Sequence, residues 1–306
     1  MITIATRKSR LALWQSEHVA AQLSQLNPGL EVRLLPLSTR GDEVLDRSLA
    51  EIGGKGLFLK ELEVAILDGR ADLAVHSLKD VPAEQPDGLE LGAFLPRANP
   101  ADLWITARGC AIADLPRGSR VGSSSLRRIS QLRAMRPDLE VTALRGNVET
   151  RLAAVREGRV AATLLAAAGL ERLGIVPEQA IVLDPEQWLP APGQGIIAVQ
   201  QRVGDAATAD LVAGLACRNA TSQALAEREV VRVLGGDCRM PLAVHAFLDG
   251  PRMQLRARLG DSSGNLIDAN ASGSSDHAAG LGNKVAQALL QSGGAELLER
   301  LNLSQN

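Results

Sequence analysis

Arginine residues gather where predicted strands pass into predicted helices. The residues at these junctions are Arg7, Arg127, Arg128, Arg145 and Arg151. In an open α/β sheet the carboxyl ends of the strands share one edge, and ligands bind there. The planar guanidinium group of arginine matches a carboxylate or a phosphate in bidentate fashion. The spacing therefore predicts a cleft for a ligand that carries several negative groups.

The stretch GSSSLRR adds main-chain donors to this cleft. Its serines can cap the helix that begins there, while free N–H groups at the helix N-terminus face an anion. Serine before a helix is usually only a cap, and a GC-rich genome would also favour arginine over lysine. The prediction therefore depends on three such junctions occurring in two successive units.

One acid, Asp80 in HSLKDVP, follows a strand that ends at the same sheet edge, and Lys79 stands beside it. Neighbouring positive charge favours the ionised form of a carboxylate. A fixed negative charge at this edge would stabilise a developing cation or accept N–H bonds. A structural salt bridge between Asp80 and one of the arginines explains the residue equally well.

The chain has three cysteines, Cys110, Cys217 and Cys238, and four well-separated histidines. An odd number of cysteines without Cys-x-x-Cys spacing supports neither a disulfide framework nor a cysteine zinc site. No metal site is therefore expected. Cys238 lies in the glycine-flanked stretch GGDCRMP and is predicted to be a thiol or a thiol derivative.

Composition argues against several other classes of protein. The formal net charge of −2 gives no reason to expect a nucleic-acid partner. No apolar run is long enough to cross a bilayer, and the first residues lack the features of a secretory signal, so we expect a cytoplasmic protein without a membrane partner. The loop IGGKGLF lacks the spacing of a phosphate-binding P-loop, which argues against a nucleotide site.

Strand and helix patterns alternate through the first two thirds of the chain. Predicted strands cover residues 2–6, 31–37, 72–77, 102–107, 119–123, 139–144, 160–166 and 196–201, and predicted helices cover residues 11–26, 57–68, 125–135 and 148–157. This alternation is typical of mainly parallel sheets with helices on their faces. The strand at 196–201 is distant in sequence from the first unit but can return to it.

The last third has a different pattern. A helix is predicted over residues 221–234, ended by Gly235 and Gly236 as a left-handed cap. Three strands over 241–248, 253–260 and 265–272 have short connections that favour an antiparallel sheet, and a helix follows over 278–290. We expect three α/β domains with boundaries near 96–101, 189–195 and 215–219. These are residues 1–96 with 196–215, residues 101–189, and residues 219–306.

Seven motifs together give the chain a family resemblance: IGGKGLF, HSLKDVP, GSSSLRR, LRGNVETRL, LAAAGLERLG, PAPGQG and GGDCRMP. From Arg7 to about Ala246 the sequence resembles the hydroxymethylbilane synthases, also called porphobilinogen deaminases. The resemblance implies two periplasmic-binding-protein-like lobes with mainly parallel sheets, and a small C-terminal α/β domain with an antiparallel sheet. It also implies a dipyrromethane cofactor joined by a thioether to Cys238, whose sulfur is then a permanent anchor.

The reaction that the resemblance implies suits these residues. The small-molecule substrate, porphobilinogen, carries acetate, propionate and aminomethyl groups. Loss of ammonia leaves an electrophilic cation, and four condensations followed by hydrolysis give a linear tetrapyrrole. The resemblance places Asp80 under the pyrrole nitrogens as the catalytic group, in a protein expected to be a monomer. It assigns cofactor binding to Lys79, Ser125, Arg127, Arg128 and Arg145, and substrate binding to Arg7, Ser9, Lys55, Arg151, Arg172 and Gln194.

Some positions depart from the family pattern, and two other classes of protein stay open. Asp237 stands next to Cys238, Ala162 replaces a common aspartate, and the pair Leu103 and Trp104 is unusual. A two-lobed binding module for a polycarboxylate would share the lobes and the anion cleft without catalysis, although Cys238 argues against it. A cysteine-nucleophile transferase would need a histidine base, and no histidine has a recognisable context for that role.

Overall fold

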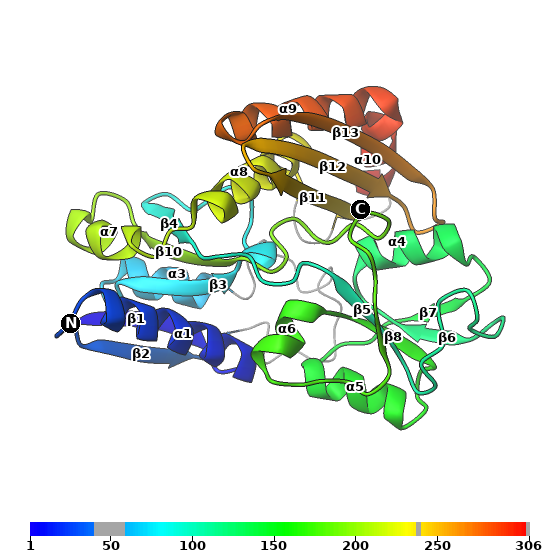
Figure 1. Cartoon of the computed structure of the whole chain (residues 1–306), viewed down its shortest axis with the longest axis horizontal. Coiled ribbons are helices and arrows are strands. Elements are labelled where there is room, and N and C mark those ends of the chain that lie inside the picture. The colour runs from blue at the N-terminus through cyan, green and yellow to red at the C-terminus, as the bar shows by residue number, and fades with distance from the viewer. Residues whose placement is uncertain (40–58, 237–239, 304–306) are drawn as a thin grey trace.

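The computed structural model describes residues 1–39, 59–236 and 240–303. Within these residues the chain forms three β-sheets, each packed against helices (Figure 1). We call the layers built on the first two sheets the first lobe and the second lobe. The third sheet, with the helices that follow it, lies across both lobes at the top of the view in Figure 1.

The first lobe is built on a sheet with the strand order β2-β1-β3-β10-β4 in the described residues. Its strands are β1 (Ile2–Arg7), β2 (Val32–Leu37), β3 (Leu73–Ser77), β4 (Leu89–Phe94) and β10 (Ile197–Arg202). β1 pairs in parallel with β2 and β3, and β10 runs antiparallel between β3 and β4. The strand expected near 196–201 therefore does return to the first unit.

The second lobe is also built on a five-stranded sheet in the described part of the chain, with the same kind of strand order. Its sheet has the order β7-β6-β8-β5-β9 in the described residues. The strands are β5 (Asp102–Thr106), β6 (Arg120–Gly122), β7 (Glu140–Thr142), β8 (Ala162–Ala166) and β9 (Ala180–Val182). β6 is parallel to β7 and β8, whereas β5 is antiparallel to β8 and β9.

In each lobe four described strands therefore point the same way and one runs against them. The reversed strands, β5 and β10, are those that directly follow the two crossings between the lobes. The expected α/β fold class is confirmed, and these crossings are the reason that the mainly parallel sheets are mixed.

Helices cover both faces of the first sheet because the residues of each strand point alternately to its two faces. The helices of this lobe are α1 (Arg10–Leu26), α3 (Lys60–Leu67) and α7 (Ala206–Ala213). Ile4 of β1 packs in one core cluster with Val19 of α1, whereas the adjacent Ala5 packs in another with Leu62 of α3. Each face therefore has its own apolar core.

The second lobe follows the same rule with α4 (Leu126–Met135), α5 (Val148–Arg156) and α6 (Ala167–Arg172). Trp104 of β5 packs in a cluster with Leu132 of α4, and Leu103 packs in a separate one with Leu152 of α5. Ala162, one of the departures from the family pattern, shares the first cluster with Trp104. These departures therefore belong to the packing of the second lobe.

The last part of the chain forms an antiparallel sheet, as expected, in the order β11-β12-β13. Its elements are β11 (Leu242–Asp249), β12 (Arg252–Gly260), β13 (Leu266–Ser274), α8 (Arg218–Val233), α9 (Ala278–Leu289) and α10 (Ala295–Leu303). Val230 of α8, Leu255 of β12 and Val285 of α9 are fully buried in one core. Gly235 has φ 63°, which confirms the left-handed end predicted for α8.

A buried carboxylate on α8 fastens this sheet to both crossings between the lobes. Glu227 accepts hydrogen bonds from Arg97 Nη1 at 2.6 Å, from the main-chain N–H of Gly193 at 2.6 Å and from that of Ala246 at 2.8 Å. Burial would raise the pKa of Glu227, but Arg97 and His245 lower it to about 2. The α8 helix is therefore held at the junction of all three sheets.

Several elements were not predicted from the sequence, namely β4, β9, α6, α7 and α10. Most are short, and β4 contains Gly92, so their hydrophobic periodicity is weak. A Cβ atom at Gly92 would lie 2.7 Å from Cδ of Gln201, so a larger residue there would have to displace the end of that side chain. No helix in the described parts of the chain is long and apolar enough to span a membrane.

The close crossing of α8 and α9 gives a test of the packing. A Cβ atom at Gly282 would meet the carbonyl oxygen of Ala226 and lie 2.7 Å from Cβ of Glu229. We expect Gly282→Ala to destabilise the protein by about 1–3 kcal/mol because the helices must separate. Gly280→Ala, in the same helix with nothing within 4 Å, should be neutral or stabilising by up to about 1 kcal/mol. Urea unfolding of both variants measures the difference, and equal midpoints would contradict the prediction.

Candidate active site

Asp80 lies at the carboxyl end of β3, where the strand passes into one 3₁₀ turn, Leu78–Asp80. The N–H of Val81 donates to the carbonyl oxygen of Leu78 at 3.0 Å and closes this turn. Leu78 and Val81 are buried, whereas Asp80 is exposed. The turn therefore presents the Asp80 carboxylate at the sheet edge expected from the sequence.

Lys79 is half-buried beside Asp80. The pKa of Lys79 is lowered to about 8, mainly by burial; the charges of Asp80 and Asp102 oppose this shift, and those of Arg128 and Arg127 contribute to it. A lysine of the first lobe is thus within electrostatic reach of two arginines on α4 of the second lobe. The lobes meet here with an excess of positive charge.

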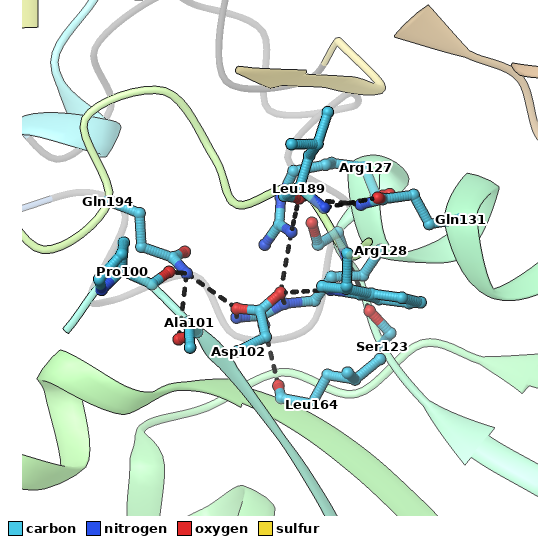
Figure 2. Close-up of polar contacts among 12 residues, drawn as sticks. Pro100, Ala101, Asp102, Ser123, Arg127, Arg128, Gln131, Leu164, Leu189 and Gln194 are labelled. Carbon is cyan, nitrogen blue, oxygen red and sulfur yellow. Dashed lines mark hydrogen bonds and ion pairs between the residues drawn. The ribbon is translucent and has the colours of Figure 1, made fainter. Parts of the chain in front are cut away.

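Asp102, the first residue of β5, is completely buried and binds the arginine pair (Figure 2). Nη1 of Arg127 donates to its Oδ2 at 2.8 Å, and Arg128 donates with Nε at 3.1 Å and Nη2 at 2.7 Å. The indole N–H of Trp188 and the amide of Gln194 donate at 2.9 and 3.0 Å. Burial would raise the pKa of Asp102, but the arginines hold it well below its usual range.

Arg127 and Arg128, predicted to bind cofactor carboxylates, are therefore already bound in part to a carboxylate of the protein. Arg127 Nη1 also donates to the carbonyl oxygen of Leu189 at 3.0 Å, and Arg128 Nη1 to that of Leu164 at 2.8 Å. These bonds fix both guanidinium planes in the first turn of α4. Two arginines and one aspartate leave this group with a net positive charge.

The serines before α4 are used differently from the expected cap. Ser125 is the N-cap residue, but its hydroxyl makes no capping bond in the described part of the chain. Instead, Oγ of Ser123 accepts from the N–H of Ser125 at 3.2 Å, and the Ser124 hydroxyl donates to the Leu144 carbonyl at 3.2 Å. Because these bonds lie outside the helix, the N-terminus of α4 can accommodate an anion.

Arg151 adds a further positive charge near Arg128. Its Nε donates to the carbonyl oxygen of Gly146 at 3.0 Å. The pKa of Arg151 is lowered to about 10, mainly by burial; Arg128 and Arg145 contribute to this shift, and Asp80 opposes it. Arg151 is thus within electrostatic reach of two other arginines and of Asp80, and all four residues were predicted from the sequence.

Arg7 and Ser9 lie where β1 passes into α1. Arg7 is half-buried near His76, whose pKa is lowered to about 4 by burial, with a further contribution from Arg7. Oγ of Ser9 accepts from the N–H of Ala12 at 3.4 Å and so caps α1. The predicted substrate-binding residue Ser9 therefore has a structural contact of its own.

Arg172 and Gln194 both contact the crossings between the lobes. Nη2 of Arg172 donates to the carbonyl oxygen of Gly195 at 2.7 Å, and its guanidinium lies 5.9 Å from the ring centroid of Trp14. Nε2 of Gln194 donates to Pro100 at 2.6 Å as well as to Asp102, and its Oε1 is buried with no hydrogen-bond partner among the described residues. No contact in the described ranges joins Arg172 to Asp80.

Two predicted site residues, Lys55 and Cys238, lie outside the described residues, as does Asp237. The described chain before Cys238 ends at Gly236, shortly after the last turn of α8. The other two cysteines, Cys110 and Cys217, are free thiols and half-buried.

Sequence reasoning missed Asp102 and Glu227, the two fully buried carboxylates that organise this region. A charged residue at the start of the apolar run DLWIT was the available signal, because a buried aspartate needs a cationic partner. Glu227 lies on a helix among other charged residues, and nothing local marks it as buried.

The charges of this region fit a cofactor with several carboxylates. The exposed Asp80 interacts electrostatically with Lys79 and Arg151. Lys79 and Arg151 both interact with Arg128, and Arg151 also interacts with Arg145. The lowered pKa values of Lys79 and Arg151 reflect the cost of burying like charges together. Carboxylates of a ligand would reduce that cost. Fold and site together thus define a two-lobed α/β protein with a cationic site for a polyanion where its lobes meet.

Comparison with known proteins identifies the family. The model "Porphobilinogen deaminase, dipyromethane cofactor binding domain" matches residues 2–210, and "Porphobilinogen deaminase, C-terminal domain" matches residues 221–291. The chain is 54% identical over 301 residues to the porphobilinogen deaminase of Xanthomonas oryzae pv. oryzae, covering 98% of this chain and 99% of that protein. It is 53% identical over 298 residues to that of Stenotrophomonas maltophilia, covering 97% and 98%. The chain therefore belongs to the porphobilinogen deaminase family.

The family model also names the cofactor, since its N-terminal part is the domain that binds dipyrromethane. Among solved structures, the periplasmic aliphatic sulphonate binding protein SsuA from Escherichia coli aligns with a TM-score of 0.42 and 15% identity over 78% of this chain and 75% of that one.

The burial of Asp102 leads to a prediction about stability. Asp102→Asn leaves two buried arginines without their counter-charge and should destabilise the protein by about 3–5 kcal/mol. Because folding lowers the pKa of Asp102, its contribution is fully present above pH of about 4 and is lost only as the pH falls further. Asp138→Asn is the control, since Asp138 pairs with Arg136 in the same lobe at a more exposed site. Urea unfolding at pH 7 should show the smaller effect for Asp138, and equal effects would contradict the prediction.

Proposed function

We propose that this chain is a hydroxymethylbilane synthase, a transferase that joins four porphobilinogen molecules with loss of ammonia and releases the linear tetrapyrrole by hydrolysis. The observation that supports it best is the position of Asp80. Its exposed carboxylate lies in the turn that follows β3, within electrostatic reach of Lys79 and Arg151, at the edge where the two lobes meet. Membership of the porphobilinogen deaminase family supplies the reaction.

The cationic residues would bind the carboxylates of the substrate and of the growing chain. Each porphobilinogen brings an acetate and a propionate, so the ligand gains two negative charges with every condensation. Arg128 and Arg127 would act from fixed positions because Asp102 holds their planes. Arg145 and Arg151 would bind further carboxylates, and Arg7, Ser9, Lys55, Arg172 and Gln194 are proposed as substrate contacts on the resemblance alone.

Asp80 would act by electrostatic stabilisation. Loss of ammonia from porphobilinogen leaves a cation whose charge is spread over the pyrrole ring, and a fixed carboxylate lowers the energy of such a species. Because Asp80 is held in a closed turn between two buried residues, little reorganisation would be needed as the charge develops.

The dipyrromethane cofactor, when bound, supplies a free pyrrole α-carbon as the nucleophile for the first condensation. We propose that Cys238 holds it through a thioether, and that Lys79, Ser125, Arg127, Arg128 and Arg145 bind its carboxylates. The net positive charge that remains after Arg127 and Arg128 pair with Asp102 supports this assignment.

The remaining parts of the proposal concern the whole chain. We propose a cytoplasmic monomer of three domains: residues 1–96 with 196–215, residues 101–189, and residues 219–306. A two-lobed binding module without catalysis would not explain a cysteine kept in the stretch GGDCRMP of a deaminase family member.

Replacement of Asp80 tests the catalytic part of the proposal. Asp80→Asn keeps the shape of the side chain and removes its charge, so the rate of ammonia release should fall by at least about 100-fold. The exposed Asp87→Asn in the same lobe is the control and should retain wild-type turnover. Circular dichroism should show that both variants are folded. Full activity of Asp80→Asn would exclude this role.

The mass of the denatured protein tests the anchor. The wild-type chain and the Cys217→Ser variant should both exceed their polypeptide mass by two linked pyrroles. Cys238→Ser should have the bare polypeptide mass, because it lacks the sulfur that forms the thioether. A wild-type chain of bare mass, or an excess that persists in Cys238→Ser, would contradict the assignment.

A further inference from the structure

The chain directly after Asp80 is held by an arginine from a distant helix. Arg228 of α8 donates from Nη1 to the carbonyl oxygen of Val81 at 3.3 Å, and from Nη2 to those of Pro82 and Ala83 at 2.8 Å each. Residues 81–83 belong to no helix or strand, so their carbonyl groups have no partners from regular structure. One planar side chain therefore binds three consecutive carbonyls next to the proposed catalytic acid.

The charged guanidinium group of Arg228 is partly removed from water in this position, which costs free energy. Burial lowers its pKa to about 10, and its hydrogen bonds described here all end on carbonyl oxygens. A half-buried arginine that served only to keep α8 soluble would point its guanidinium to water. The arrangement indicates that the role of the Arg228 guanidinium is to bind the main-chain carbonyl groups of residues 81–83.

Apolar packing holds the same segment to the same helix. Leu78 and Val81, on either side of the Lys79–Asp80 pair, lie in one core cluster with Ala220 and Ala224 of α8. The exposed Asp80 is thus flanked by two residues buried against α8, while Arg228 binds the carbonyls that follow. The position of Asp80 depends on α8 through both kinds of contact.

On its other side the segment is tied to the first sheet. Nε2 of Gln85 donates to the Pro82 carbonyl at 3.1 Å, and Oε1 of Gln85 accepts from Gln200 of β10 at 3.0 Å. Gln200 also bonds His76 of β3 at 3.0 Å. Residues 81–85 therefore bridge the sheet that carries Asp80 and the helix that carries Arg228.

We propose that Arg228 is a positioning residue for Asp80: by holding residues 81–83 on α8, it fixes the orientation of the Asp80 carboxylate during the reaction. This inference rests on the proposed function.

The test compares Arg228→Gln and Arg228→Lys with Arg232→Gln. Arg232 lies one turn further along α8 and is exposed, with an ion pair to Glu229, so its replacement removes the same charge from the same helix. Turnover is measured per cofactor-loaded chain, with loading determined from the denatured mass. Hydrogen–deuterium exchange of a peptide covering residues 77–86 reports the order of the Asp80 segment independently of activity.

We expect Arg228→Gln to lower kcat by about 10-fold or more with KM changed by less than about 3-fold, because the acid is misplaced while the carboxylate-binding residues remain. The 77–86 peptide should exchange faster in this variant, and Arg228→Lys should be intermediate in both measurements. Arg232→Gln should match the wild type. If Arg228→Gln does not fold, the values for Arg228→Lys decide.

Three outcomes would overturn the inference. Unchanged kcat in Arg228→Gln would show that the contact is merely structural, and a lower kcat without faster exchange would show that Arg228 acts in another way. An equal loss in Arg232→Gln would show a general effect of charge on α8. A loaded wild-type chain that releases no ammonia would instead overturn the proposed function, and this inference with it.

Discussion

The arrangement of the second lobe depends on the burial of one carboxylate, Asp102. Removing a carboxylate from water is costly, and the cost is offset only when charged and neutral donors surround it. Asp102 obtains them from α4, as Arg127 and Arg128, and from the returning crossing between the lobes, as Trp188 and Gln194. Any movement of α4 away from β5 would leave this charge unsatisfied. The guanidinium planes at the site are consequently fixed before a ligand binds.

Glu227 is a second buried carboxylate, on the other side of the crossings, and it too is surrounded by hydrogen-bond donors. It accepts from Arg97 on the outgoing crossing and from the N–H of Gly193 on the returning one. The two crossings also bond each other, since Arg97 Nε donates to the Gln194 carbonyl at 2.9 Å and the N–H of Ala98 to the Gly195 carbonyl at 3.0 Å. The connection between the lobes is therefore an ordered, hydrogen-bonded pair of segments between two buried carboxylates. These two hydrogen-bonded segments therefore hold the lobes in their relative orientation.

Local sequence patterns predicted much of this architecture. Strands and helices with clear periodicity were located to within a few residues, and the strand-to-helix junctions with arginine or Asp80 were identified because topology brings such junctions to one edge. Partners distant in sequence could not be predicted in this way. The bond between Asp102 and Arg128 spans 26 residues and that between Arg97 and Glu227 spans 130, and neither leaves a periodic signal. The roles expected for Lys55 and Cys238 remain predictions from the family resemblance, because both lie outside the described residues.

The position of β10 has a consequence for synthesis of the protein on the ribosome. In the described residues β4 pairs only with β10, and β10 begins at Ile197, after all five strands of the second lobe have been made. Until β10 has been synthesised, the first lobe therefore has an open edge at β3 and an unpaired β4. The strands of the second lobe are all synthesised during this time. A strand edge left open in this way can pair with other chains. The order of translation thus exposes the half of the molecule that carries Asp80 to misassembly for longer than the half that follows it.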